Sequence, residues 1–268
     1  MKKLLTFTSL IGLLILGFHF YFQYMGRSRP VVNEFFINSA EIPAPFDGVR
    51  LVQLSDILIK DDASLTLLEQ TVASVNQLNP EIIVFTGNLF FPTGSHLNTQ
   101  VAAILSELDA GLLKIAVLGY HDLPLQDVVL ATLATSGFRV LENESIQVFN
   151  QSPHGINVIG AHPLNDSAST HTLLDVHARS DRFNVVLSSV PTFTTVSFHH
   201  PVDLQLSGHC RGIQDTSHTH APCFQFYNSL YKFPNAFTLH VSPGLARFDQ
   251  FTDMVRAPQI TSFLLIRP

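Results

Sequence analysis

The sequence predicts an α/β fold, and two features of the chain lead to that prediction. Strand-like and helix-like segments alternate through the first half, which is the pattern of βαβ units around a parallel sheet. The second half is richer in short strand-like segments. The chain has 268 residues, 46% of them hydrophobic, and this is enough to fill one large core. We therefore expect a single α/β domain, preceded by an apolar segment at the amino terminus.

The elements expected in the first half follow from the spacing of apolar residues. Apolar positions recur at helical spacing in three segments, and short apolar runs rich in β-branched residues lie between them. Strands are expected at 31–37, 51–54, 81–85 and 114–118, and helices at 64–78, 97–108 and 126–135. In the second half, strands are expected at 139–141, 146–149, 156–159, 184–187, 203–206, 236–240 and 260–266, a helix at 173–179 and a loop at 163–172.

The amino-terminal segment predicts a membrane anchor. Residues 4–25 contain no Asp, Glu, Lys or Arg, and about 20 helical residues span a bilayer core. The run is longer than the apolar part of a signal peptide and lacks a small-residue cleavage site, so an uncleaved anchor at 1–29 is favoured over a cleaved signal. The basic residues on its two sides nearly balance. We expect a single-pass anchor with the domain, residues 30–268, outside the cytoplasm.

Charge and cysteine content limit the classes of function. The net charge is −6 and no basic run is present, which argues against nucleic acid binding. The only cysteines, Cys210 and Cys223, do not match a disulfide scaffold or a zinc knuckle. Whether they form a bridge is left open by the sequence.

Four of the expected strands end in polar residues. Because the carboxyl ends of parallel strands meet at one edge of a sheet, such residues gather into a site. Asp56 follows the run 51–54, Asn88 follows 82–85, Gly119-Tyr120-His121-Asp122 follows 114–118, and His209 follows 203–206.

These strand ends, in this order and spacing, resemble the calcineurin-like metallophosphoesterase family, and most closely its small bacterial membrane-anchored or exported members. In the family the strand ends carry Asp-x-His, Gly-Asp, Gly-Asn-His-Asp, a histidine before x-Pro, and Gly-His-x-His. This chain has Asp56-Ile57-Leu58, Gly87-Asn88, Gly119-Tyr120-His121-Asp122, Ser189-Val190-Pro191 and Gly208-His209-Cys210-Arg211 at the matching places. The resemblance implies a four-layer α/β/β/α sandwich with two mixed sheets over residues 30–268. It also implies two divalent ions such as manganese, iron or zinc, which would activate water for phosphoester hydrolysis.

The chain departs from this pattern at most of the implied metal ligands. Asp56 and His209 keep the family's residue, and Asn88 replaces the bridging aspartate with a neutral amide. The remaining ligand positions are lost; they hold Leu58, Tyr120, Ser189 and Arg211. His121 keeps the position of the family's proton donor.

The prediction from these changes is a catalytically inactive pseudo-phosphoesterase with no cofactor, or at most a weakly bound divalent metal. One alternative is a residual or repurposed phosphoester hydrolase that uses His121 and His209. A second is an anion-binding scaffold anchored on Arg211, with a protein or an anionic ligand as partner. We also expect Arg211 to pair with Asp56 in place of a metal, since a buried carboxylate needs a partner.

Two further expectations concern aromatic and imidazole side chains. The ring of Tyr120 is expected to fill the emptied second metal position. The histidines of 199–200 and 217–220 resemble metal ligands, but their polar context predicts solvated loops.

Overall fold

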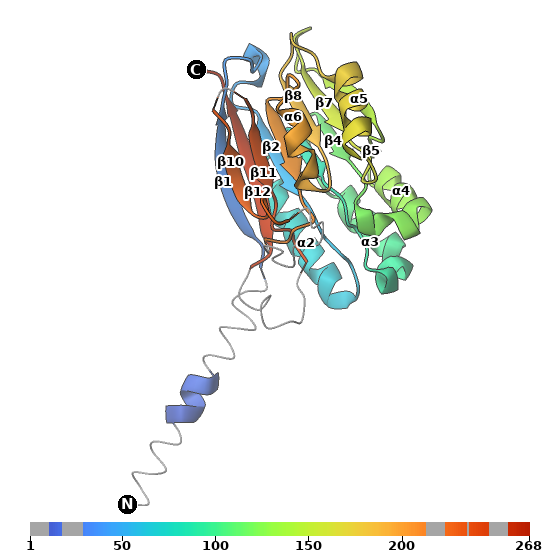
Figure 1. Ribbon diagram of the computed structural model, residues 1–268. Helices are drawn as coiled ribbons and strands as arrows, with labels where there is room; N and C mark the ends of the chain where they lie inside the picture. Colours follow the sequence, from blue (N-terminus) through green and yellow to red (C-terminus); the bar gives the residue numbers. More distant parts are fainter. Residues whose placement is uncertain (1–10, 18–28, 213–222, 235, 247–256) are drawn as a thin grey trace, which may run out of the picture.

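The computed structural model describes residues 11–17, 29–212, 223–234, 236–246 and 257–268. Two six-stranded sheets pack face to face, with helices on both outer faces (Figure 1). The prediction of an α/β fold with two mixed sheets is confirmed.

The first sheet contains the expected parallel run of the first half, extended by the two ends of the domain. Its order is β1-β12-β2-β3-β4-β5; β12 runs antiparallel to β2, and the other neighbours are parallel. The bounds are β1 (Val31–Asn38), β12 (Gln259–Ile266), β2 (Arg50–Leu54), β3 (Ile82–Phe85), β4 (Leu113–Ala116) and β5 (Phe138–Val140).

The second sheet has the order β10-β11-β9-β8-β7-β6, with antiparallel pairs only at its two edges. Its bounds are β10 (Ser229–Lys232), β11 (Thr238–Val241), β9 (Leu204–Ser207), β8 (Asn184–Leu187), β7 (Ile156–Gly160) and β6 (Glu144–Val148). The polar motifs follow five of these strands: β2, β3 and β4 in the first sheet, and β8 and β9 in the second. The motifs therefore lie at the strand ends of two neighbouring sheets.

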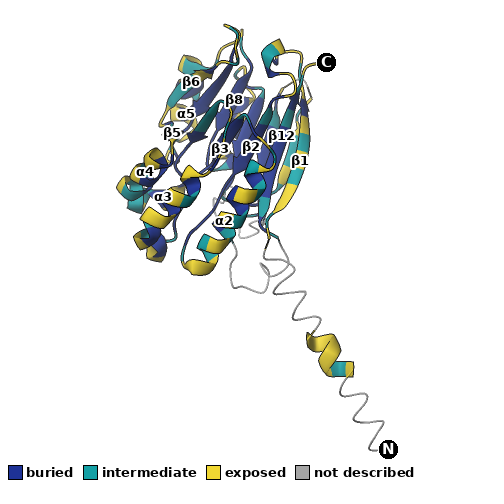
Figure 2. Ribbon diagram, turned by 180° about the vertical axis from the view of Figure 1, so that it is seen from behind, coloured by how far each residue is buried: buried dark blue, intermediate teal, exposed yellow. Residues whose placement is uncertain are grey.

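Three apolar layers result from the alternation of side chains along each strand. The layer between the sheets includes Leu51, Val84, Val185 and Leu206, while the outward residues of the first sheet pack on three helices. These helices are α2 (Asp62–Asn76), α3 (Asn98–Ser106) and α4 (Gln126–Thr135); the second sheet is covered by α5 (Ser167–His177) and α6 (Thr194–Ser197). Figure 2 shows the buried strands behind helices whose outer faces are exposed.

The prediction of a loop at 163–172 was wrong in part. Residues 163–172 were expected to be a loop, but α5 begins at Ser167. The side chain of Asp166 accepts a hydrogen bond of 2.8 Å from the backbone N–H of Ser169, so part of the polar stretch is a helix N-cap. Strand β10 was not predicted.

The predicted membrane anchor lies mostly outside the described residues, which include only 11–17 of it, in helical conformation. No helix within the described ranges has the length and apolar character to cross a bilayer.

A buried polar bridge joins the two sheets beneath the strand ends. Gln53 on β2 donates hydrogen bonds to the carbonyl of Ser207 (2.9 Å) and to the hydroxyl of Thr86 (3.0 Å). Its Oε1 atom therefore accepts from Nδ1–H of His240, 2.7 Å away on β11. The imidazole lies against the rings of Phe35 and Phe263, and burial lowers the pKa of His240 to about 3.

His240 predicts a loss of stability in mild acid. The unfolded chain takes up this proton below its ordinary pKa of 6.5, whereas the folded protein does not. The stabilisation is therefore complete above pH 6.5 and is lost as the pH falls toward 3. Between pH 7 and pH 5 the wild type should lose about 2 kcal/mol more unfolding free energy than His240→Gln. Urea unfolding at both pH values measures the difference, and equal losses in the two proteins would contradict the prediction.

Candidate functional site at the strand ends

The loops that follow β2 and β3 run side by side and form the floor of the site. The backbone N–H of Asp56 donates to the carbonyl of Gly87 (3.0 Å), and that of Leu58 donates to the carbonyl of Asn88 (3.1 Å). The loops after β4 and β9 reach the same place through hydrogen bonds to Asn88 and Asp56. The strand ends singled out in the sequence thus lie together.

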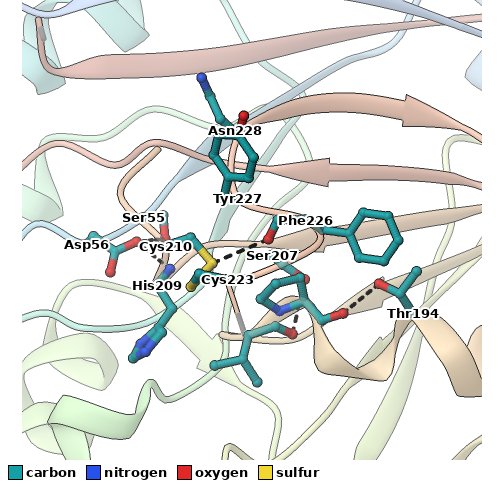
Figure 3. Close-up of a disulfide and its surroundings, with 12 residues drawn as sticks. Ser55, Asp56, Thr194, Ser207, His209, Cys210, Cys223, Phe226, Tyr227 and Asn228 are labelled. Atoms are coloured by element: carbon teal, nitrogen blue, oxygen red, sulfur yellow. Dashed lines mark hydrogen bonds between the residues drawn. A yellow bond between two sulfur atoms is a disulfide. The ribbon is translucent and has the colours of Figure 1, made fainter. Parts of the chain in front are cut away.

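Asp56 is buried and both of its carboxylate oxygens accept hydrogen bonds. Oδ1 accepts from the side-chain amide of Asn88 at 2.7 Å. Oδ2 accepts from the backbone N–H of His209 at 2.8 Å and from the hydroxyl of Ser55 at 2.6 Å (Figure 3). Only 1% of Asp56 is exposed. The donors Ser55 and the His209 backbone were not predicted; the adjacency of Ser55 to Asp56 was the one available signal.

The orientation of the Asn88 amide is fixed by its second contact. Its Oδ1 accepts from the backbone N–H of His121 at 3.0 Å, so its NH₂ group must face Asp56. Gly119 packs against this amide, because a Cβ atom there would lie 2.2 Å from Asn88 Oδ1. The position that carries a bridging aspartate in the family's pattern therefore presents a hydrogen-bond donor to the neighbouring carboxylate.

Asp122 holds the loops after β3 and β4 together. Its carboxylate accepts three backbone hydrogen bonds, each of 2.7 Å, from Asn88, Leu89 and Gly119. Burial raises the pKa of Asp122 to about 6, and these hydrogen bonds oppose the shift. Asp122 thus fixes the turn at Gly119-Tyr120-His121-Asp122 from inside the protein.

Two histidine side chains, those of His121 and His209, lie next to each other in the site. The rings of His121 and His209 stack with their centroids 5.6 Å apart and their planes 19° apart. Burial lowers the pKa of His209, His121 and Arg211 lower it further, and Asp56 opposes the shift. Burial therefore favours the neutral form of the His209 imidazole.

Two buried polar atoms near these rings have no hydrogen-bond partner within the described part of the chain. They are Nδ1 of His209 and Oγ of Ser189. Ser189 follows β8 and Gly208 follows β9, and the N–H of Gly208 donates to the Ser189 carbonyl at 3.2 Å. Such atoms are costly to bury unpaired, so each is a candidate contact for a water molecule or a polar ligand.

The prediction that the ring of Tyr120 fills the second metal position was wrong. Tyr120 is 55% exposed, and its ring lies edge-on to that of His121 at 6.2 Å. The reason is the backbone turn held by Asp122, which starts the short 3₁₀ helix Tyr120–Leu125 and directs the tyrosine to solvent. Leu58 is buried. The pairing of Asp56 with Arg211 stays a prediction, since the contacts of Asp56 given above are all to neutral donors.

Several named proteins are similar in sequence to this chain. Uncharacterized metallophosphoesterase YkuE of Bacillus subtilis (strain 168) is 30% identical over 204 residues, which cover 74% of this chain and 70% of that protein. The chain belongs to the calcineurin-like metallophosphoesterase family.

More distant comparisons agree with this membership. A Bos taurus protein named "Transmembrane protein with metallophosphoesterase domain" is 24% identical over 254 residues, covering 88% of this chain and 57% of its own length. The solved structure of Haemophilus influenzae NAD nucleotidase shares the fold, with a TM-score of 0.50 and 13% identity, over 74% of this chain and 45% of the nucleotidase. No protein-family profile matches the chain.

Within the described part of the chain, the candidate site offers few of the donors that a pair of metal ions requires. The predicted remnant ligand positions are Asp56, Asn88 and His209, and the oxygens of Asp56 and the amide of Asn88 are already hydrogen-bonded. Among the described side chains, no three of the types His, Cys, Asp and Glu form a group that could hold a metal. Residues 217–220, with their two histidines, lie outside the described residues.

A disulfide answers the question that the sequence left open about the two cysteines. Cys210 and Cys223 are bonded, with their Cα atoms 5.3 Å apart (Figure 3). Cys210 lies between His209 and Arg211, whose backbones both have positive φ (69° and 50°). The bridge therefore restrains the segment whose backbone N–H binds Asp56.

Replacing Asp122 with asparagine should destabilise the protein. An amide has one acceptor oxygen, so at least one of the three backbone N–H groups would face an NH₂ donor. Leaving a buried donor unpaired costs about 1–3 kcal/mol. We expect Asp122→Asn to lose unfolding free energy of this size at pH 7, measured by urea unfolding.

The exposed Asp109 provides the matched control, because its carboxylate lies on the surface. Asp109→Asn should change the unfolding free energy by less than about 0.5 kcal/mol. A loss for Asp122→Asn no larger than that of the control would show that the three hydrogen bonds do not hold the turn.

Proposed function

We propose that this metallophosphoesterase-family domain has lost two-metal phosphoester hydrolysis and acts as a binding protein, that is, as a pseudo-phosphoesterase. The observation that carries the proposal is the hydrogen bond from the Asn88 amide to the Asp56 carboxylate (2.7 Å). A side chain that bridges two cations must present oxygen lone pairs to both of them, and Asn88 presents N–H instead.

A flip of the Asn88 side-chain amide would not restore a metal ligand at this position. Asn88 Oδ1 would leave the backbone N–H of His121 and meet the oxygen of Asp56, which places two acceptors in contact. Around this pair, Leu58 has no donor atom and Arg211 is a permanent cation, which repels a metal ion. Hydrogen bonds thus occupy the places where metal coordination would be needed.

The purified full-length protein should not hydrolyse a generic phosphodiester when manganese is added. A variant that restores the family pattern should gain manganese binding and manganese-dependent turnover, because its carboxylate and imidazole ligands return. Its changes are Leu58→His, Asn88→Asp, Tyr120→Asn, Ser189→His and Arg211→His. Turnover is followed by release of the chromogenic leaving group, and folding of the variant by circular dichroism.

Manganese-dependent turnover by the wild type would overturn this proposal if His209→Ala abolished it. That result would instead support the alternative of a repurposed hydrolase that uses His121 and His209. The control is Tyr120→Asn alone, which changes an exposed side chain and should leave the protein inactive.

Anion binding is the second candidate function for the same site. It is favoured by Nδ1 of His209 and Oγ of Ser189, which have no hydrogen-bond partner among the described residues, and by Arg211, whose charge acts on His209. Guanidinium and imidazole groups suit phosphate and carboxylate ligands. In the same experiment, inorganic phosphate added without metal should raise the melting temperature of the wild type more than that of Ser189→Ala. An equal rise in both would exclude this role for Ser189.

We further propose that residues 4–25 anchor the protein in a membrane, with the domain outside the cytoplasm. The Bos taurus relative carries the word transmembrane in its name, which supports membrane association. The Cys210–Cys223 bridge supports an oxidising compartment, because disulfides persist there and are rare in the cytosol.

The protein should remain in the membrane fraction after an alkaline wash, and a chain lacking residues 1–29 should be released. In intact cells, a membrane-permeant maleimide should leave Cys210 and Cys223 unmodified until a reductant is added. Cys210→Ser provides the control, because it frees the thiol of Cys223. Release of the full-length protein by the wash would contradict the membrane anchor. Immediate labelling of both cysteines would contradict the location outside the cytoplasm.

A further inference from the structure

Strand β1, which follows the amino-terminal segment, begins at the same edge of the domain as the strand-end site. Strand β1 is parallel to β12, and β12 is antiparallel to β2, so β1 starts at the carboxyl end of β2. Val31 pairs with Gln259 at the start of β12, and the N–H of Gln259 donates to the carbonyl of Gly244 at 3.0 Å. Two residues further along, the N–H of Ala246 donates to the carbonyl of Asp56 at 2.8 Å. Backbone contacts therefore join the start of β1 to the floor of the site.

The chain between the apolar run and the domain is short. The run ends at residue 25 and β1 begins at Val31, so the residues between them can span at most about 20 Å even when fully extended. Neighbouring strands lie about 4.8 Å apart, and only β12 separates β1 from β2. With residues 4–25 in the bilayer, this attachment favours an orientation in which the edge that holds Asp56 faces the membrane. The opposite edge, where β12 ends near the terminus marked C in Figure 1, then faces away from it.

We propose that the strand-end site faces the membrane and binds the phosphate group of a phospholipid headgroup. This inference rests on the membrane anchor and the anion-binding function proposed above, and adds to them the orientation of the domain and the source of the ligand. An anchored site meets the phosphates of its own membrane at a high effective concentration, because the encounter takes place within one assembly.

The polar groups of the site suit a phosphate that approaches from this edge. Oγ of Ser189 and Nδ1 of His209 are buried and have no hydrogen-bond partner among the described residues. The ring of His209 stacks on that of His121 with a centroid distance of 5.6 Å, and His121 is exposed, so the site extends to the protein surface. Arg211 contributes a positive charge that acts on His209. Hydroxyl, imidazole and guanidinium groups all donate hydrogen bonds to phosphate oxygens.

The side chain of Tyr120 fits a position at the membrane surface. It is 55% exposed and adjacent to His121. Tyrosine combines an apolar ring with a polar hydroxyl group and is enriched where lipid hydrocarbon meets the headgroups. Phe149 offers a matched position at the opposite edge, because it is 48% exposed and follows β6, whose end pairs with the start of β7. These two aromatic residues can therefore report which edge meets the membrane.

Tryptophan fluorescence of the full-length protein in liposomes tests the orientation, because the chain contains no tryptophan. Tyr120→Trp and Phe149→Trp each place a single reporter at one edge. With phospholipids brominated near the headgroup, which quench tryptophan on contact, the emission of Tyr120→Trp should fall relative to unbrominated liposomes. The emission of Phe149→Trp should be the same in both.

The same liposomes separate failure of the orientation from failure of the anchor. An unquenched Tyr120→Trp protein that stays in the liposomes after an alkaline wash would overturn this inference and leave the anchor standing. Quenching of Phe149→Trp alone would do the same. Release of the protein by the wash would overturn the anchor and this inference together.

The source of the ligand is tested by thermal unfolding of the full-length protein in a neutral detergent. Phosphatidylglycerol should raise the melting temperature at concentrations at least about tenfold below those needed with glycerophosphoglycerol, its deacylated headgroup. Ser189→Ala should need at least about tenfold more lipid than the wild type for the same rise, because it loses a hydrogen bond to a charged group. Diacylglycerol, which lacks the phosphate, is the control and should have no effect.

Each other outcome contradicts a defined part of the inference. Equal potency of the lipid and its deacylated headgroup would show that the ligand comes from solution, which overturns this inference while the anion-binding function stands. Equal responses of the wild type and a folded Ser189→Ala protein to the lipid would place the lipid outside the strand-end site. No response to either phosphate compound would overturn anion binding and this inference together.

Discussion

The arrangement at the strand ends depends on one buried carboxylate that accepts three backbone hydrogen bonds. Asp122 joins the N–H groups of Asn88, Leu89 and Gly119, and so fixes the loops after β3 and β4 against each other. These contacts are to the main chain and do not depend on a bound ion. The two loops are therefore held in position by contacts within the chain itself.

The side chains above this backbone are linked by hydrogen bonds. Asp56, which would face the first metal in the family's pattern, accepts from Asn88, Ser55 and the backbone of His209. These donors relieve the cost of burying its charge. The second half of the site is less complete, because Ser189 Oγ and His209 Nδ1 are buried without partners among the described residues. The contacts of Asp56 are therefore satisfied within the protein, whereas His209 and Ser189 retain polar atoms that a ligand or a water molecule could contact.

Local patterns in the sequence predicted the elements better than the orientations of the side chains. Helix α4 was predicted at 126–135 and lies there, because its apolar spacing and the following Ser136-Gly137 are local signals. The exposure of Tyr120 was missed, since it depends on the contacts of Asp122 to a different loop. The Cys210–Cys223 bond could not be predicted either, because it requires the close approach of two segments in the fold. Membership of the family and the convergence of Asp56, Asn88, His121 and His209 were predicted from the strand-end motifs.

The hydrogen bond between Asn88 and Asp56 also has an evolutionary consequence. Changing Asn88 back to aspartate alone would place two carboxylates within hydrogen-bonding distance in a buried site. Like charges at this separation oppose each other, and one must be protonated unless a cation lies between them. Leu58 and Arg211 supply no ligand for such a cation. Acquiring aspartate at position 88 alone is therefore expected to lower stability, so a metal site here would need several substitutions together.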